Sequence, residues 1–198
     1  MPDLKRIRFV ATNYAYLQGL KFVPLGVGVL LIVGWMQIGG RALAVPIAIG
    51  IVVMTAIWLT ERYYERAVGR TRASLAYRLS DGGLALGGGA LALAALWVDV
   101  YLRPPVSLLG LTCAVVILCD YVRMNWLAGG RFRSYALVMA VLVAVTSLLP
   151  LLGLRMWYTL FAVLAAMGVA AIVLGLLDHR LPMQAMRPAP EVSDGQPL

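Results

Sequence analysis

The sequence is poor in the side chains that usually carry catalytic or metal chemistry. It holds one histidine, His179, and two cysteines, Cys113 and Cys119, whose spacing of six residues puts them on different faces of a helix. That spacing favours neither a disulfide nor a shared metal ion. A phosphate-binding glycine loop ending in Lys-Ser/Thr, a Gly-x-Ser-x-Gly elbow and a His-Glu-x-x-His zinc motif are all missing. We therefore expect no metal and no cofactor, and the sequence lends little support to an enzyme.

Acidic residues are scarce as well. Nine Asp and Glu residues stand against 17 Lys and Arg residues, which gives a net charge of +8, while 62% of the chain is hydrophobic. Soluble domains contain roughly 45–50% apolar residues, and a helix needs about 20 of them to cross a bilayer. Apolar stretches of that length occupy most of the 198 residues and leave no room for a soluble catalytic domain. The predicted fold class is an all-α integral membrane protein.

Short polar segments divide the apolar sequence into six predicted transmembrane helices within residues 22–180. We place these spans at 22–38, 42–59, 83–102, 106–122, 135–153 and 156–177. Successive glycines at 39–40 and prolines at 104–105 are residues that end helices. The segment between the last two spans is so short that those helices must run antiparallel. The predicted architecture is three antiparallel helical hairpins.

Lysine and arginine are distributed very unevenly between the two sides of this arrangement. Fourteen of the 17 fall on the side of the N-terminus, and only Arg41, Arg103 and Arg155 fall on the other. Short loops rich in Lys and Arg remain in the cytoplasm, so we predict cytoplasmic termini in a multi-pass protein of the bacterial cytoplasmic membrane. Cations beside a membrane have anionic lipid headgroups as their nearest counter-charges. We therefore expect a lipid bilayer as the environment and no nucleic acid partner.

The two ends of the chain differ from the apolar middle. Apolar residues recur at spacings of three and four from Leu4 to Leu17, with Lys5, Arg6 and Arg8 on the other face. This pattern predicts an interfacial amphipathic helix over residues 1–21. The alternative is a basic leader that only sets the orientation of the chain. Residues 181–198 are polar and contain several prolines, which predicts a disordered cytoplasmic tail.

The longest cytoplasmic connection, residues 60–81, holds five arginines. If the second span continues into it as a helix, three of these arginines recur every four residues and share one face. We predict a binding surface for an acidic protein partner or anionic lipid headgroups. Its residues are Arg62, Arg66, Arg70, Arg72, Tyr63 and Tyr64. The alternative is an interfacial girdle that only anchors the span.

Small residues indicate where helices touch. Glycine and alanine recur four residues apart at the start of the third span, and alanine does so in the last span. Side chains this small let helix backbones approach closely, which drives association in lipid. The predicted packing residues are Gly83, Ala85, Gly87, Gly88, Gly89, Ala162, Ala166 and Ala170. A flexible segment that lines a cavity is the alternative for the consecutive glycines.

One acidic residue falls inside a predicted span. Asp99 lies four residues before Arg103, so we predict an intramembrane ion pair between them. The alternative is a proton or cation site. No second acid is buried in another predicted span, since Asp120 lies at the very end of its span, so a relay of carboxylates cannot be assembled within one subunit.

Three function classes remain. The leading prediction is a non-catalytic membrane subunit or regulatory protein that presents basic cytoplasmic loops to a membrane protein partner, a second copy of itself or anionic lipid. A small oligomeric transporter or channel is the second, and a lipid-modifying membrane enzyme is the third. Transport and catalysis normally need polar residues that converge, and few are evident in the sequence.

Overall fold

The computed structural model describes residues 19–68, 75–128 and 134–185. Within these ranges the chain forms helices and no strands. The elements are η1 (Gly19–Lys21), α2 (Phe22–Gln37), α3 (Ala44–Val68), α4 (Leu75–Tyr101), α5 (Leu108–Ala128), α6 (Ser134–Ser147), η2 (Leu149–Leu152) and α7 (Met156–Ala185). The predicted interfacial helix, apart from its last three residues, and the final part of the predicted tail lie outside the described ranges.

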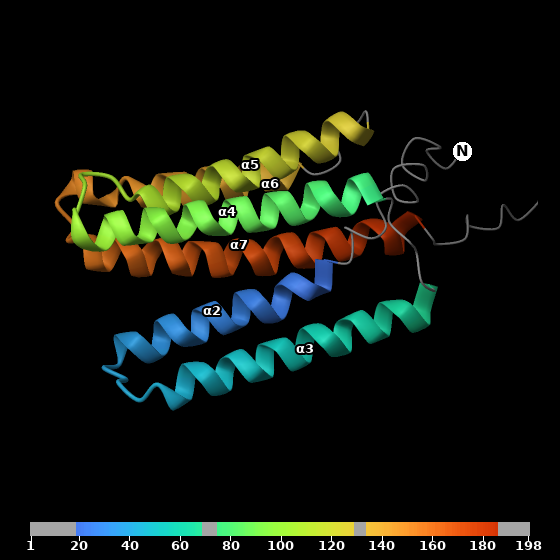
Figure 1. The fold of residues 1–198 in the computed structure, drawn as a ribbon, viewed down its shortest axis with the longest axis horizontal. Helices are drawn as coiled ribbons and strands as arrows, with labels where there is room; N and C mark the ends of the chain where they lie inside the picture. Colours follow the sequence, from blue (N-terminus) through green and yellow to red (C-terminus); the bar gives the residue numbers. More distant parts are fainter. Residues whose placement is uncertain (1–18, 69–74, 129–133, 186–198) are drawn as a thin grey trace, which may run out of the picture.

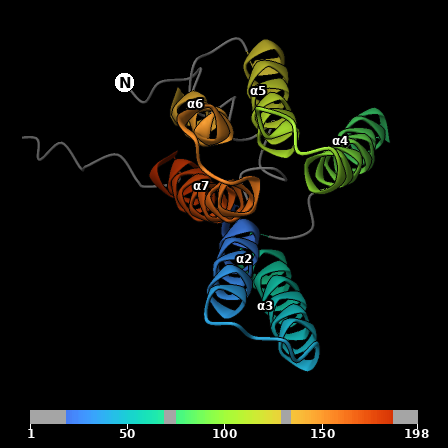
Figure 2. The ribbon, with the colours of Figure 1, turned by 90° about the vertical axis from the view of Figure 1, so that its left-hand side faces the viewer.

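The six α-helices lie alongside one another as a bundle, with the turns after α2, α4 and α6 at the same end (Figure 1). Helix α7 lies in the middle, packed against α2 on one side and against α5 and α6 on the other (Figure 2). Helix α3 is at the edge of the bundle, where it packs mainly against α2 and η1. The most extensive contacts, α2 with α7 and α5 with α6, join helices from different predicted hairpins.

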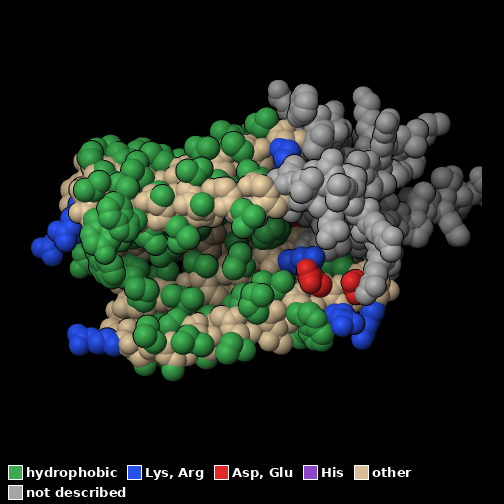
Figure 3. All heavy atoms as spheres, viewed as in Figure 1, with side chains coloured by type: hydrophobic (Ala, Val, Ile, Leu, Met, Phe, Trp, Pro, Cys, Tyr) green, Lys and Arg blue, Asp and Glu red, His purple; other side chains and the backbone are tan. Residues whose placement is uncertain are grey.

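Four helical segments are long and apolar enough to cross a membrane: Gly19–Gln37, Ala44–Arg66, Gly82–Tyr101 and Met156–Arg180. Helix α6 is a shorter apolar helix of 14 residues, and α5 is not among the four. Apolar side chains cover the middle of the face seen in Figure 3, while charged side chains gather at both ends. Together these features indicate an integral membrane protein.

Several helices extend beyond the predicted spans. Helix α3 continues to Val68, and α4 begins at Leu75, because good helix formers flank the apolar core of each span. Helix α7 continues to Ala185, so the first residues of the predicted tail are helical. Helix α6 is instead shorter than predicted, and a 3₁₀ turn that includes Pro150 follows it. Proline lacks the N–H that would continue the α-helical hydrogen bonding.

The closest approach between helices occurs where η1 and α2 run antiparallel to α7. A Cβ atom on Gly26 would lie 2.4 Å from the carbonyl oxygen of Gly168, and one on Gly19 would lie 2.2 Å from that of Gly175. The two glycines in each segment are seven residues apart, which is about two helical turns, so both pairs fall on the same faces. Only glycine leaves space for backbones this close.

The glycines predicted as a packing site at the start of the third span face open space instead. Nothing lies within 4 Å of a Cβ position on Gly83, Gly87 or Gly89, and only Gly88 faces a neighbour, Val116 of α5, at 3.1 Å. The side chain of Ala85 lies outside the described set. The α4 glycines therefore form no close contact with α7 among the described residues. A contact with another chain stays a prediction.

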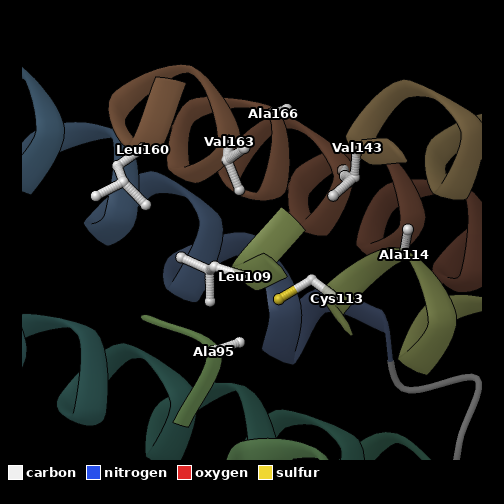
Figure 4. Close-up of a cluster of buried hydrophobic side chains, with 9 residues drawn as sticks. Ala95, Leu109, Cys113, Ala114, Val143, Leu160, Val163 and Ala166 are labelled. Carbon is white, nitrogen blue, oxygen red and sulfur yellow. The ribbon is translucent and has the colours of Figure 1, made fainter. Parts of the chain in front are cut away.

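The alanine stripe of α7 does face the interior. Ala166 and Ala170 are buried, and Ala162 is half-buried. Ala166 and Ala170 belong to a core cluster where α5, α6 and α7 meet, with α4 at its edge (Figure 4). Its buried members are Ala95, Leu109, Cys113, Ala114, Val143, Leu160, Val163, Ala166 and Ala170. Cys113 acts there as a small apolar side chain with a free thiol, and Cys119 is exposed.

Candidate functional site

Part of the predicted binding surface lies on the last turns of α3. Arg62 and Arg66 are one helical turn apart, and both are exposed. The guanidinium carbon of Arg62 lies 5.0 Å from the ring centroid of Trp58, within the range of a cation–π interaction. With Leu59 and Tyr63, these residues line a surface cavity of about 530 Å³, here called the α3 cavity. It combines two cations with an apolar and aromatic wall.

The other predicted members of the binding surface are placed differently. Arg70 and Arg72 lie outside the described residues. Tyr64 is only 2% exposed, and its hydroxyl group lies 2.8 Å from Nδ1 of His179 on α7. Tyr64 therefore links α3 to the centre of the bundle and does not reach a partner at the surface. The sequence predicts Tyr64 as part of the binding surface beside Tyr63, but successive residues of a helix point in different directions, and only Tyr63 is exposed.

A second buried polar pair lies next to the first. Asp178 is 1% exposed and accepts a hydrogen bond from the hydroxyl group of Tyr135 at the start of α6. Because Asp178 and His179 are consecutive, α7 binds α6 through one residue and α3 through the next. This convergence of polar residues was not predicted from the sequence. The available signal was the Asp178-His179 pair at one helix end, together with tyrosines at the ends of two other spans.

An ion pair joins two further elements at the same end of the bundle. The Nζ atom of Lys21 lies 3.0 Å from Oε1 of Glu61, so η1 is tied to α3 one residue before Arg62. Both side chains are partly exposed, and a pair of this kind contributes about 0–1 kcal/mol. The carboxylate of Glu61 therefore pairs with Lys21, and Glu61 does not line the α3 cavity.

Asp99 has partners other than the one predicted. Its carboxylate is fully buried and accepts a hydrogen bond from the Ser107 hydroxyl group at 2.7 Å. It also accepts the backbone N–H groups of Leu108 at 2.8 Å and Leu109 at 3.0 Å. The carboxylate thus caps the N-terminus of α5, where free N–H groups favour negative charge. Among the described residues it makes no ion pair with Arg103, since the helix ends at Tyr101 and the i, i+4 geometry is lost.

Metal chemistry has no evident site in the part of the chain that the structure describes. No group of three or more His, Cys, Asp or Glu side chains in those ranges lies close enough together to hold a metal ion. Asp120 of α5 forms an ion pair with Arg123 at 2.8 Å. That pair lies within one helix and stabilises it only modestly.

The fold and its apolar surface define the class of protein as helical and membrane-embedded. No family model, no curated protein and no solved structure matches this chain. The function must therefore be argued from the geometry of the chain itself.

Proposed function

We propose that this chain is a non-catalytic, multi-pass membrane protein that binds anionic lipid headgroups at the α3 cavity. The observation that carries the proposal is the pairing of Arg62 and Arg66 with Trp58, Leu59 and Tyr63 around one cavity. A phosphate group suits the arginines, because guanidinium donors match its oxygens. The aromatic and aliphatic side chains suit the glycerol and first methylene groups of the same lipid.

The charge distribution supports a cytoplasmic place for this cavity. In the proposed topology all six helices cross the membrane and both termini are cytoplasmic, so the C-terminal end of α3 lies on the side that carries fourteen of the 17 Lys and Arg residues. The cytoplasmic leaflet is the usual location of anionic lipid, and each basic residue near such a surface contributes about 1 kcal/mol of binding. An acidic segment of a membrane protein partner is the competing occupant.

The test replaces both described arginines and measures lipid binding directly. The R62Q/R66Q variant, purified in neutral detergent, should bind phosphatidylglycerol roughly 30-fold more weakly, since two charges together contribute about 2 kcal/mol. Native mass spectrometry resolves the successive lipid-bound states, so the affinity of the site that R62Q/R66Q removes is measured apart from that of any other lipid site. The matched control is R41Q, an exposed arginine at the other end of the bundle, which should bind like the unaltered protein.

The result distinguishes lipid from protein as the occupant. Unchanged phosphatidylglycerol binding by R62Q/R66Q, with native abundance and helix content, would contradict the lipid proposal. If the same variant then lost a protein that co-purifies with the unaltered chain, the cavity would belong to a protein partner. Loss of neither would leave Arg62 and Arg66 as interfacial anchors.

A further inference from the structure

A second cavity lies at the opposite end of the bundle, between the α4–α5 turn and the segment that leads from η2 into α7. It encloses about 690 Å³, within the range of about 300–1,000 Å³ that is usual for small-molecule sites. Arg103 and Arg155 both line it, and Trp157 and Leu160 supply an apolar wall. We call it the distal cavity.

The lining of the distal cavity carries a net positive charge, with two arginines against one carboxylate. Arg103 and Arg155 are exposed, and among the described residues neither forms an ion pair. Asp99 also lines the cavity, but its two oxygens already accept three hydrogen bonds from Ser107 and the start of α5. The oxygens of Asp99 are thus occupied in capping a helix and form no ion pair with either arginine, so both guanidinium groups keep their donors for an anion.

The backbone at Arg103 gives an independent indication of function. Its φ angle is 47°, and it is the one non-glycine residue with positive φ in the described ranges. A side chain with a Cβ atom is disfavoured in this left-handed region, whereas glycine adopts it without cost. The residue that follows is Pro104, which restricts the conformation of Arg103 further. This chain therefore carries a cationic side chain at a position that glycine would fill with less strain.

We propose that the distal cavity binds the phosphate ester group of an amphiphilic molecule. The two guanidinium groups bind the phosphate oxygens, for which their planar donor pattern is suited. Trp157 and Leu160 pack against the apolar part of the same molecule. A phospholipid headgroup and a water-soluble phosphate ester share this chemistry. This site is separate from the α3 cavity and does not depend on the function proposed for it.

The test is photolabelling with a phosphatidylglycerol analogue that carries a diazirine in its acyl chain, followed by peptide mass spectrometry. In the unaltered protein the label should appear on peptides covering residues 97–105 and 154–160. The amount of label on these peptides should be lower by about tenfold or more in the R103G/R155Q variant, since a hydrogen bond to a charged group commonly contributes a factor of ten or more in affinity. Glycine at position 103 accepts the positive φ, so the variant should unfold no more easily than the unaltered protein.

Three controls distinguish a phosphate site from general contact with lipid. The R62Q/R66Q variant should keep full labelling of residues 97–105 and 154–160. If glycerol 3-phosphate competes with the label, a soluble ester is an adequate ligand. If it does not compete, the ligand is the lipid. Both results retain the phosphate site. Undiminished labelling of R103G/R155Q, or equal labelling by a diacylglycerol analogue without phosphate, would overturn it.

Discussion

Asp99 shows how a single residue can be placed in an apolar bundle. An ionised carboxylate costs several kcal/mol to bury unless donors and opposite charge surround it. Here Ser107 and the first N–H groups of α5 supply the donors, and the N-terminus of α5 supplies a partial positive charge. Ser107 is itself held by its N–H bond to the carbonyl oxygen of Ser147 at 2.9 Å. One carboxylate thereby connects the ends of α4, α5 and α6.

We expect Asp99→Ala to destabilise the protein by about 2–4 kcal/mol, because two buried N–H groups and one hydroxyl group lose their acceptor. The Arg103→Gln variant should change the free energy of unfolding by less than about 0.5 kcal/mol, since Arg103 is exposed and makes no ion pair with Asp99. Unfolding in mixed micelles with increasing dodecyl sulfate measures both. If Arg103→Gln lowered the free energy of unfolding as much as Asp99→Ala, the result would support the predicted ion pair between the two residues.

The pairs Tyr64–His179 and Tyr135–Asp178 each join one buried side chain to one partly buried side chain. Their four side chains converge at one end of the bundle, yet none lines the α3 cavity or the distal cavity. We therefore assign them to holding α3 and α6 against α7. The sequence shows that each residue lies near a helix end, but it does not show which helix ends meet. That information depends on tertiary packing, so neither pair could be predicted.

Among the helices, the contact between α2 and α7 is the one that depends most on residue size. Glycines at 19 and 26 meet glycines at 175 and 168, and the carbonyl oxygens on the opposite helix occupy the space that a side chain would need. The α4 glycines were the stronger candidates in the sequence because their four-residue spacing is a familiar packing pattern. A seven-residue spacing repeated in two helices is a weaker signal, since it becomes meaningful only when both helices are known to be antiparallel neighbours.

We predict that Gly26→Ala and Gly168→Ala each destabilise the protein by about 1–3 kcal/mol, the usual cost of overpacking. The added Cβ atom would lie 2.4 Å from the carbonyl oxygen of Gly168 in the first variant, and 2.9 Å from Cγ of Leu30 in the second. Gly50→Ala on α3 is the control, because nothing lies within 4 Å of its Cβ position. Unfolding in mixed micelles should show the control unchanged or slightly stabilised. Equal tolerance at all three positions would contradict a tight α2–α7 contact.

Helix existence was more predictable than helix ends. Each of the six predicted spans overlaps one α-helix, because long apolar runs favour helices wherever backbone groups must be satisfied internally. The ends differ by up to nine residues, as at α3, where the helix continues from the predicted Leu59 to Val68. Charged and polar residues close an apolar run without ending the helix. The basic face of α3 could be predicted because the helix can continue through the charged residues after the apolar run. The distal cavity could not be predicted, since it combines two turns that are far apart in the chain.

For the molecule as a whole, the number of membrane crossings is the main question. Four helical segments are long and apolar enough to cross alone, and α6 with its 14 residues measures only about 21 Å. The four-residue η2 adds about 8 Å, which brings the pair close to the roughly 30 Å of the hydrocarbon core. Six crossings are therefore compatible with the length of the α6–η2 segment, and they agree with the charge asymmetry between the two sides.

Residue 130 distinguishes six crossings from four. If α5 and α6 both cross, the α5–α6 connection lies in the cytoplasm with Arg131 and Arg133; if neither crosses, it stays outside with the α4–α5 turn. After Cys113 and Cys119 are replaced by Ser, single cysteines at Gly40, Pro104 and Arg155 should react with an impermeant maleimide added outside intact cells. Cysteines at Gly69 and Gly130 should react only after the membrane is permeabilised. External labelling at Gly130 but not at Gly69 would establish four crossings. External labelling at Gly69 would overturn the orientation of the chain, since five arginines between 62 and 78 would then lie outside.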